Sequence, residues 1–193
     1  MATTNLIVDF LVIGITSMVW IVPVVVALVG WGWLSVLLGL GAGAIPLLLG
    51  LAYVLGLIVS RLADDALDTW NDAWRDRVFG ISPATSYHNR INFIFTHSDT
   101  AEEYLSYRRS IIRISRSCAI NLLLGSLAWA FTAQWTGVGC AGTIAICFFL
   151  LVGSIFLFRT WREVLRGYFR SVEDMYNYLS AEGLAESEVG GSE

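Results

Sequence analysis

Residues 10–60 read FLVIGITSMVWIVPVVVALVGWGWLSVLLGLGAGAIPLLLGLAYVLGLIVS, and none of these 51 side chains carries a charge. A second uncharged run, of 42 residues, covers positions 117–158. A helix needs about 20 apolar residues to cross the hydrocarbon core of a bilayer, so each run is long enough for a hairpin of two spans. We therefore expect an all-α integral membrane protein with four transmembrane helices and helical extensions outside the membrane.

The composition of the whole chain agrees with this interpretation. Hydrophobic residues make up 56% of it and charged residues 15%, against the ~45–50% and ~25% of a usual soluble domain. A soluble enzyme, a secreted disulfide scaffold and a disordered chain are therefore excluded. The first residues, MATTNLIVDF, contain no Lys or Arg, so they lack the basic region of a cleaved signal peptide and begin a retained span.

Two hairpins follow from these runs, at 1–60 and 118–158, with spans at about 7–28, 37–60, 118–136 and 141–158. The second span is less regular than the others because Gly39, Gly41, Gly43 and Pro46 interrupt it. We expect a kink there, or a short interfacial or re-entrant piece before it. Such a break is either a packing kink or the lining of a channel.

The basic residues predict the orientation. All twelve are Arg, eight between positions 61 and 117 and four between 159 and 170. Because basic residues stay on the cytoplasmic side, we place segments 61–117 and 159–193 in the cytoplasm. An even number of spans then puts the N-terminus there too. We expect a multi-pass protein of a bacterial inner membrane.

Segment 61–117 is predicted to be a helix, a loop and a helix. The first helix continues the second span through residues 61–79 and ends at Gly80 and Pro83. Positions 81–98 show no evident helical period and are expected to be a connecting loop. A capping box, Thr100 with Glu103, starts the next helix, which runs directly into the third span.

The fourth span is expected to continue as a cytoplasmic helix over 159–180. Apolar residues recur there at spacings of four and three, which is typical of a seam that packs on another helix or binds a soluble partner. The acidic, Gly-rich residues 181–193 are expected to be a disordered tail. The seam consists of Trp161, Leu165, Tyr168, Val172, Met175 and Leu179.

Like charges form rows at helical spacing outside the spans. Because like charges mildly destabilise a helix, such rows suggest that opposite rows face each other. We favour an interlock of acidic and basic rows, within one subunit or between subunits. Contact with anionic lipid headgroups, or binding of an anionic ligand such as a nucleotide, are the alternatives. The rows are Asp64, Asp68, Asp72 and Asp76; Arg109, Arg113 and Arg116; and Arg159, Arg162, Arg166 and Arg170.

The sequence offers little catalytic chemistry. Arg90 and His97 form an Arg–x6–His pair that resembles the ribonuclease motif of HEPN domains, but Ile91 stands where that motif has a polar residue. We expect no enzyme, no metal site and no cofactor. The cytoplasmic segments carry no net positive charge, so a nucleic-acid partner is not expected. Within the spans, Asn121 is expected to form an interhelical hydrogen bond.

The order of elements between about 100 and 180 is a capped helix containing YRRSIIRISRS (107–117), a tight two-span hairpin and a heptad-like helix. It resembles in layout the SLATT-type two-span effector domains of prokaryotic antiviral systems. It also resembles small four-span accessory proteins encoded beside some CRISPR and deaminase-based defence nucleases. This resemblance implies an oligomeric pore-forming or membrane-perturbing subunit controlled by a cytosolic partner. A non-conducting membrane anchor that recruits a soluble protein is the alternative.

Overall fold

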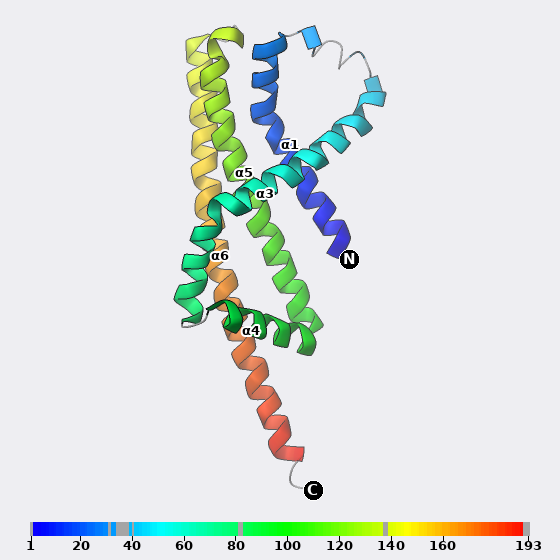
Figure 1. The fold of residues 1–193 in the computed structure, drawn as a ribbon, viewed down its shortest axis with the longest axis vertical. Helices are drawn as coiled ribbons and strands as arrows, with labels where there is room; N and C mark the ends of the chain where they lie inside the picture. Colours follow the sequence, from blue (N-terminus) through cyan, green and yellow to red (C-terminus); the bar gives the residue numbers. More distant parts are fainter. Residues whose placement is uncertain are drawn as a thin grey trace. The chain divides into compact units, whose positions relative to one another are not determined.

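The computed structural model describes residues 2–30, 32, 33, 39, 41–80, 83–136 and 139–190. Throughout this part of the chain the regular structure is helical, which confirms the all-α class. The elements in chain order are α1 (Ala2–Val29), the 3-10 turn η1 (Gly41–Gly43), α3 (Ala44–Phe79), α4 (Pro83–His97), α5 (Asp99–Thr136) and α6 (Cys140–Gly190); they are drawn in Figure 1.

Four helices in the described part of the chain are long and apolar enough to cross a membrane. They lie within α1, α3, α5 and α6, over Leu6–Val29, Ile45–Phe79, Asp99–Ala133 and Ala141–Ala181. The last three continue without interruption from the apolar runs into the charged segments, as the sequence predicts. The number of candidate spans is therefore confirmed.

Two glycines end helices by adopting a left-handed backbone conformation. Gly30 (φ 85°) follows α1 and donates its N–H to the Val26 carbonyl, and Gly80 (φ 65°) follows α3 and donates to the Asp76 carbonyl. Glycine adopts positive φ without the steric cost that a Cβ imposes, which explains its use at this position. The predicted end of the helix at Gly80 is confirmed.

The prediction of a loop at 81–98 is wrong, because α4 occupies most of it. Pro83 stands at the first helical position, where its missing N–H costs nothing. Tyr87, Ile91 and Ile94 then follow at spacings of four and three, and the two isoleucines are buried. This apolar face is narrow and is separated by polar residues, which is why the period is easily missed.

Two helix ends also differ from expectation. Ser98 caps α5 in place of Thr100, because its hydroxyl accepts the N–H of Ala101 at 3.3 Å. The helix α6 continues through Gly190, so most of the segment expected to be a disordered tail, 181–193, is helical; 191–193 lie outside the described residues.

The second span begins later than expected. It starts at Ala44, after η1, and Pro46 lies in the first turn of α3, where proline is tolerated because the first N–H groups have no helical acceptor. Pro46 therefore does not interrupt α3. The expected start of the span at 37 lies outside the described residues.

The chain divides into two compact units. Unit 1 comprises Met1–Ala66 and Ile112–Trp161, and unit 2 comprises Leu67–Ile111 and Arg162–Glu193. Unit 1 holds most of the apolar sequence. Unit 2 holds α4, the charged ends of α3 and α6 and the beginning of α5.

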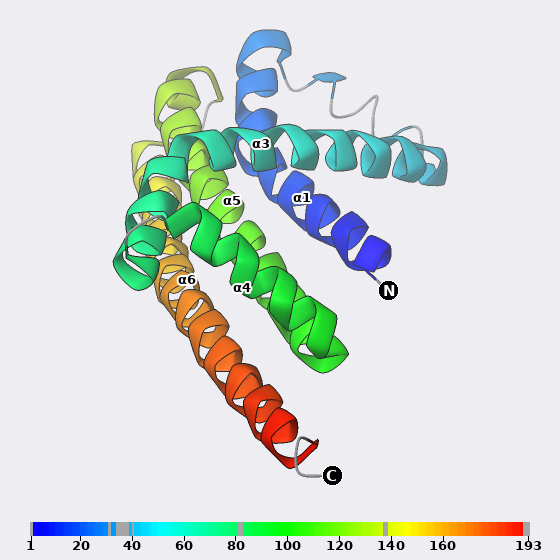
Figure 2. The same ribbon diagram turned by 60° about the horizontal axis from the view of Figure 1, so that its bottom comes forward.

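In unit 1, α3 crosses α1 at very short range (Figures 1 and 2). A Cβ placed on Gly14 would lie 1.6 Å from the carbonyl oxygen of Ala52, and one on Gly56 would lie 1.8 Å from that of Phe10. The two positions on α3 form an Ala–x–x–x–Gly pattern, the small-residue spacing that lets helix backbones approach closely in membranes.

A buried polar cluster joins α1 to α5 in unit 1. The Asn121 side chain accepts hydrogen bonds from Ser17 (3.2 Å) and Trp20 (3.0 Å). It donates to the Ile13 carbonyl and to the Thr16 hydroxyl, both at 2.9 Å. All four hydrogen-bonding positions of the amide are thus used although the residue is fully buried. The predicted interhelical hydrogen bond of Asn121 is confirmed.

The later part of α5 packs beside the first part of α6, also in unit 1 (Figures 1 and 2). Ser126 donates to the Cys147 carbonyl at 3.2 Å, and the Cys147 thiol lies 3.3 Å from the Ser126 carbonyl. The Ser154 hydroxyl donates to the Ala119 carbonyl at 2.8 Å. These bonds satisfy polar side chains within an apolar helix pair.

Unit 2 has an aromatic core. Phe79 lies within 5.4 Å of Tyr87 and 6.0 Å of Phe169, between ring centroids, and Tyr168 lies 5.6 Å from Phe169. These residues come from α3, α4 and α6, so ring packing holds three helices together. Such aromatic pairs add about 0.5–1.5 kcal/mol each beyond their buried area.

Candidate functional site

Two ion pairs within unit 1 connect α5 to the other helices. Arg113 donates to Asp9 of α1 at 2.9 Å, and its guanidinium also lies over the ring of Phe10. Arg116, one turn further along, pairs with Asp64 of α3. Asp9 is only 4% exposed, so it does not reach water at the edge of its span as its position near the N-terminus suggests.

The predicted charge rows are only partly brought together. Among the ion pairs of the described residues, Asp64 with Arg116 is the one contact between an acidic and a basic row. Asp72 and Asp76 instead lie 2.8 Å and 3.8 Å from Arg75 on their own helix. Other members of the rows are exposed, namely Asp68, Arg159 and Arg170.

Arg109 belongs to a tyrosine cluster in unit 2. Its Nε donates to the Tyr168 hydroxyl at 2.7 Å, and that hydroxyl lies 2.9 Å from the hydroxyl of Tyr87. Burial raises the pKa of Tyr168 well above its usual range, and Tyr87 adds to the rise, while Arg109 opposes it. Tyr168 therefore stays protonated at neutral pH.

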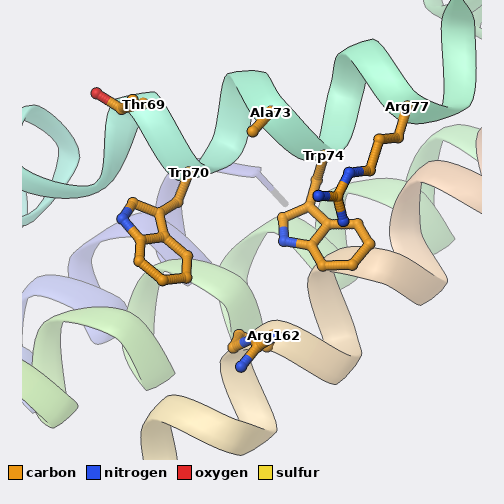
Figure 3. Close-up of a pocket in the computed structure, with 6 residues that line it drawn as sticks. All are labelled: Thr69, Trp70, Ala73, Trp74, Arg77 and Arg162. Carbon is orange, nitrogen blue, oxygen red and sulfur yellow. The ribbon is translucent and has the colours of Figure 1, made fainter.

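The described part of unit 2 also contains a pocket between the charged ends of α3 and α6. It has a volume of about 320 Å³, at the lower end of the range of small-molecule sites. Figure 3 shows the side chains of Trp70, Trp74 and Arg77 on one wall, projecting from α3 toward Arg162 of α6. Thr69, Trp70, Ala73, Trp74, Arg77 and Arg162 line it.

The guanidinium groups around this pocket are not neutralised by carboxylates. Arg77 and Arg166 both lie against the ring of Trp74, at 4.7 Å and 4.1 Å from its centroid. No ion pair of Arg77, Arg162 or Arg166 occurs among the ion pairs of the residues that the structure describes. The Nε atoms of Arg162 and Arg166 are buried without a hydrogen-bond partner there. The pocket thus combines indole rings with uncompensated positive charge.

The seam on α6 is largely covered by this chain itself. Trp161, Leu165, Tyr168 and Val172 are each at most 4% exposed, whereas Met175 and Leu179 are half-buried. In this fold the first four side chains are therefore not accessible to a soluble partner.

The four residues predicted to shape a kink or channel are exposed. A Cβ on Gly39, Gly41 or Gly43 would meet no atom within 4 Å, and Pro46 is exposed as well. Among the residues that the structure describes, none comes within 4 Å of a Cβ at these three glycines.

Arg90 and His97 are each engaged separately on α4. The Arg90 guanidinium lies over the rings of Phe79 and Tyr176, at 5.2 Å and 5.1 Å, and 3.6 Å from Glu173. His97 stacks on another α4 ring and bonds a backbone carbonyl of its own helix. These contacts give both residues a structural role.

The described residues contain no cluster of three or more His, Cys, Asp or Glu that could hold a metal ion. The described side chains and helices together define an all-α protein with four helices suited to a membrane and an aromatic, arginine-lined pocket. Comparison with models of known protein families, with curated proteins and with solved structures gave no significant match.

Several of these features follow from residues that the sequence analysis did not single out. The close helix crossing depends on Gly14 and Gly56, and the signal for it is the Ala–x–x–x–Gly spacing at 52–56. Trp70, Trp74 and Arg77 line the pocket, and their spacings of four and three place them on one face of α3.

Proposed function

We propose that this chain is a multi-pass protein of a bacterial inner membrane that assembles with copies of itself and opens or perturbs the bilayer, under control from its cytoplasmic side. The four apolar helices support insertion. The placement of all twelve Arg outside the uncharged runs supports cytoplasmic N- and C-termini. Unit 2 would then face the cytoplasm.

Exposed apolar side chains support the membrane part of this proposal. In the most apolar 18-residue window of α6 only 11% of the residues are buried within the chain. Phe148, Phe149 and Phe156 are 60%, 72% and 69% exposed. A surface of this kind would cause aggregation in water and is stable when lipid or another apolar helix covers it.

The proposal that copies of the chain assemble rests on the exposure of the first two turns of α3. Ile45, Leu47, Leu49 and Leu51 are all exposed although they point to different sides of the helix. The described residues of a single chain leave these four side chains uncovered, and the glycines before them offer a surface without side chains. A second copy packing here would bring Gly39, Gly41, Gly43 and Pro46 to an interface or channel.

A pore subunit is favoured over a membrane anchor because the helix seam that an anchor would offer to a soluble partner is buried. A proton-coupled pump is a third alternative. It is disfavoured because such a pump needs an ionised residue in the middle of the spans, and none lies there. A cytosolic trigger remains compatible with unit 2, which carries the arginine-lined pocket.

The proposal is tested by measuring the mass of the full chain in nanodiscs together with dye release from liposomes. We expect a discrete oligomer that releases dye. Gly43→Leu should reduce release if this segment lines a channel, whereas Gly50→Leu is the matched control because both glycines face open space. A monomer that leaves liposomes sealed would contradict the proposal.

A further inference from the structure

We propose that the pocket formed by Trp70, Trp74, Arg77 and Arg162 is a binding site for the phosphate headgroup of an anionic phospholipid. This inference rests on the membrane insertion proposed above but not on oligomerisation or pore formation. All the residues that line the pocket belong to unit 2, and they come from only two helices, α3 and α6.

The wall from α3 has a regular construction. Trp70, Ala73, Trp74 and Arg77 recur at spacings of three, one and three, so they share one face of the helix. The small Ala73 between two indoles leaves the space that the pocket occupies (Figure 3). A volume of about 320 Å³ accommodates a glycerophosphate group but not a folded peptide segment.

The charge of the wall favours an anion. Arg77 of α3 and Arg166 of α6 both lie against the ring of Trp74, so Arg166 adjoins the pocket that Arg77 and Arg162 line. Planar guanidinium groups match the geometry of phosphate oxygens and can bind them with two parallel hydrogen bonds. Three arginines without carboxylate partners therefore form a site that an anion stabilises.

The position of Arg162, close to the end of the uncharged run in α6, favours a lipid as the source of the phosphate. Arg162 follows Phe158, the end of the uncharged run in α6, by four residues, which is one helical turn or ~6 Å. Headgroup phosphates lie at this depth, and Trp and Arg are the residues that gather there.

Native mass spectrometry of the full-length chain in detergent tests the site. The protein is titrated with phosphatidylglycerol and, separately, with phosphatidylcholine of the same acyl chains. We expect saturable binding of phosphatidylglycerol, and a loss of affinity of about fivefold for each of Arg77→Gln, Arg162→Gln and Arg166→Gln. Arg170→Gln is the matched control on α6, because this residue is exposed and outside the pocket.

A second variant separates a built site from general electrostatic attraction. Ala73→Trp fills the pocket while keeping every arginine, so it should abolish the preference for phosphatidylglycerol. Unchanged binding by Ala73→Trp, or equal binding of the two lipids, would overturn the proposal. Inorganic phosphate is added at 10 mM as a competitor. If it binds the site with the same affinity as phosphatidylglycerol, the site is one for free phosphate and the assignment to lipid is overturned. Flotation with liposomes checks insertion independently, so a failure of the proposed function is distinguished from a failure of this site.

Discussion

Gly56 of α3 faces the backbone of Phe10 of α1 so closely that a Cβ at this position would lie 1.8 Å from the Phe10 carbonyl oxygen. The same crossing brings Gly14 against Ala52, so two glycines, one from each helix, let the backbones meet. The atoms that a Cβ would strike are backbone atoms, which cannot rotate away. The first hairpin of the chain therefore depends on the absence of a side chain at both positions.

Gly56→Ala is expected to force α1 and α3 apart and to cost about 1–3 kcal/mol, as is usual when a packed interface receives an extra carbon. Thermal unfolding in detergent, followed by size-exclusion chromatography, measures the loss. Gly50→Ala on the same helix is the control, because a Cβ there meets nothing within 4 Å. Equal melting temperatures for the two variants would contradict the close crossing.

Asn121→Leu is expected to destabilise unit 1. It removes four hydrogen bonds and leaves the Ser17 hydroxyl and the Trp20 N–H without the acceptor that they share. The expected cost is about 1–3 kcal/mol. Thr132→Val is the matched control, since the buried Thr132 hydroxyl donates to the Ala128 carbonyl of its own helix. A larger effect from Thr132→Val than from Asn121→Leu would show that the cluster does not hold α1 to α5.

The number of candidate spans could be predicted from the sequence because it depends on the length of uncharged runs, which is a local property. The continuation of α3, α5 and α6 beyond those runs could be predicted as well, since no Pro interrupts them there and apolar residues keep a helical spacing in α6. Helix α4 was missed because Pro83 is a breaker within a helix but a good starter at its first position, and only the neighbouring structure decides which applies.

Contacts between helices were harder to predict than the helices themselves. Rows of Asp and Arg indicate that opposite charges meet, but they do not indicate which residue meets which. Asp9 lies more than one hundred positions from Arg113, and their pairing depends on the rotation of α1 about its axis. The pocket likewise requires that Trp74 of α3 and Arg162 of α6 face each other. The spacing of residues along each helix does not indicate this contact.

Reversal of the charges in one ion pair tests the observed pairing. Arg116→Glu should lower the free energy of unfolding by about 1–3 kcal/mol because Asp64 loses its guanidinium partner and a second carboxylate, at a buried position, faces it. Asp64→Arg in the same chain should restore most of the loss. Asp68→Arg, one turn further along α3, should restore little because Asp68 is not the partner of Arg116. Chemical unfolding of the three variants and the unchanged protein measures the coupling, and equal rescue by both second changes would show a general attraction between rows.

Tyr168 should make the stability of unit 2 sensitive to alkaline pH. Burial raises the pKa of Tyr168, so its hydroxyl keeps the proton in the folded protein at a pH at which the unfolded chain releases it. A group with a raised folded pKa contributes its full stability below the unfolded value, ~10 for tyrosine, and loses this contribution as the pH rises toward the folded value. The melting temperature should therefore fall above about pH 10.

Tyr168→Phe should be less stable at pH 7, because Arg109 and Tyr87 lose their partner, but should lose less stability between pH 9 and 11. Tyr178→Phe, at a position 67% exposed, is the control and should keep the alkaline loss of the unchanged protein. An identical alkaline loss in Tyr168→Phe would assign the effect to other groups.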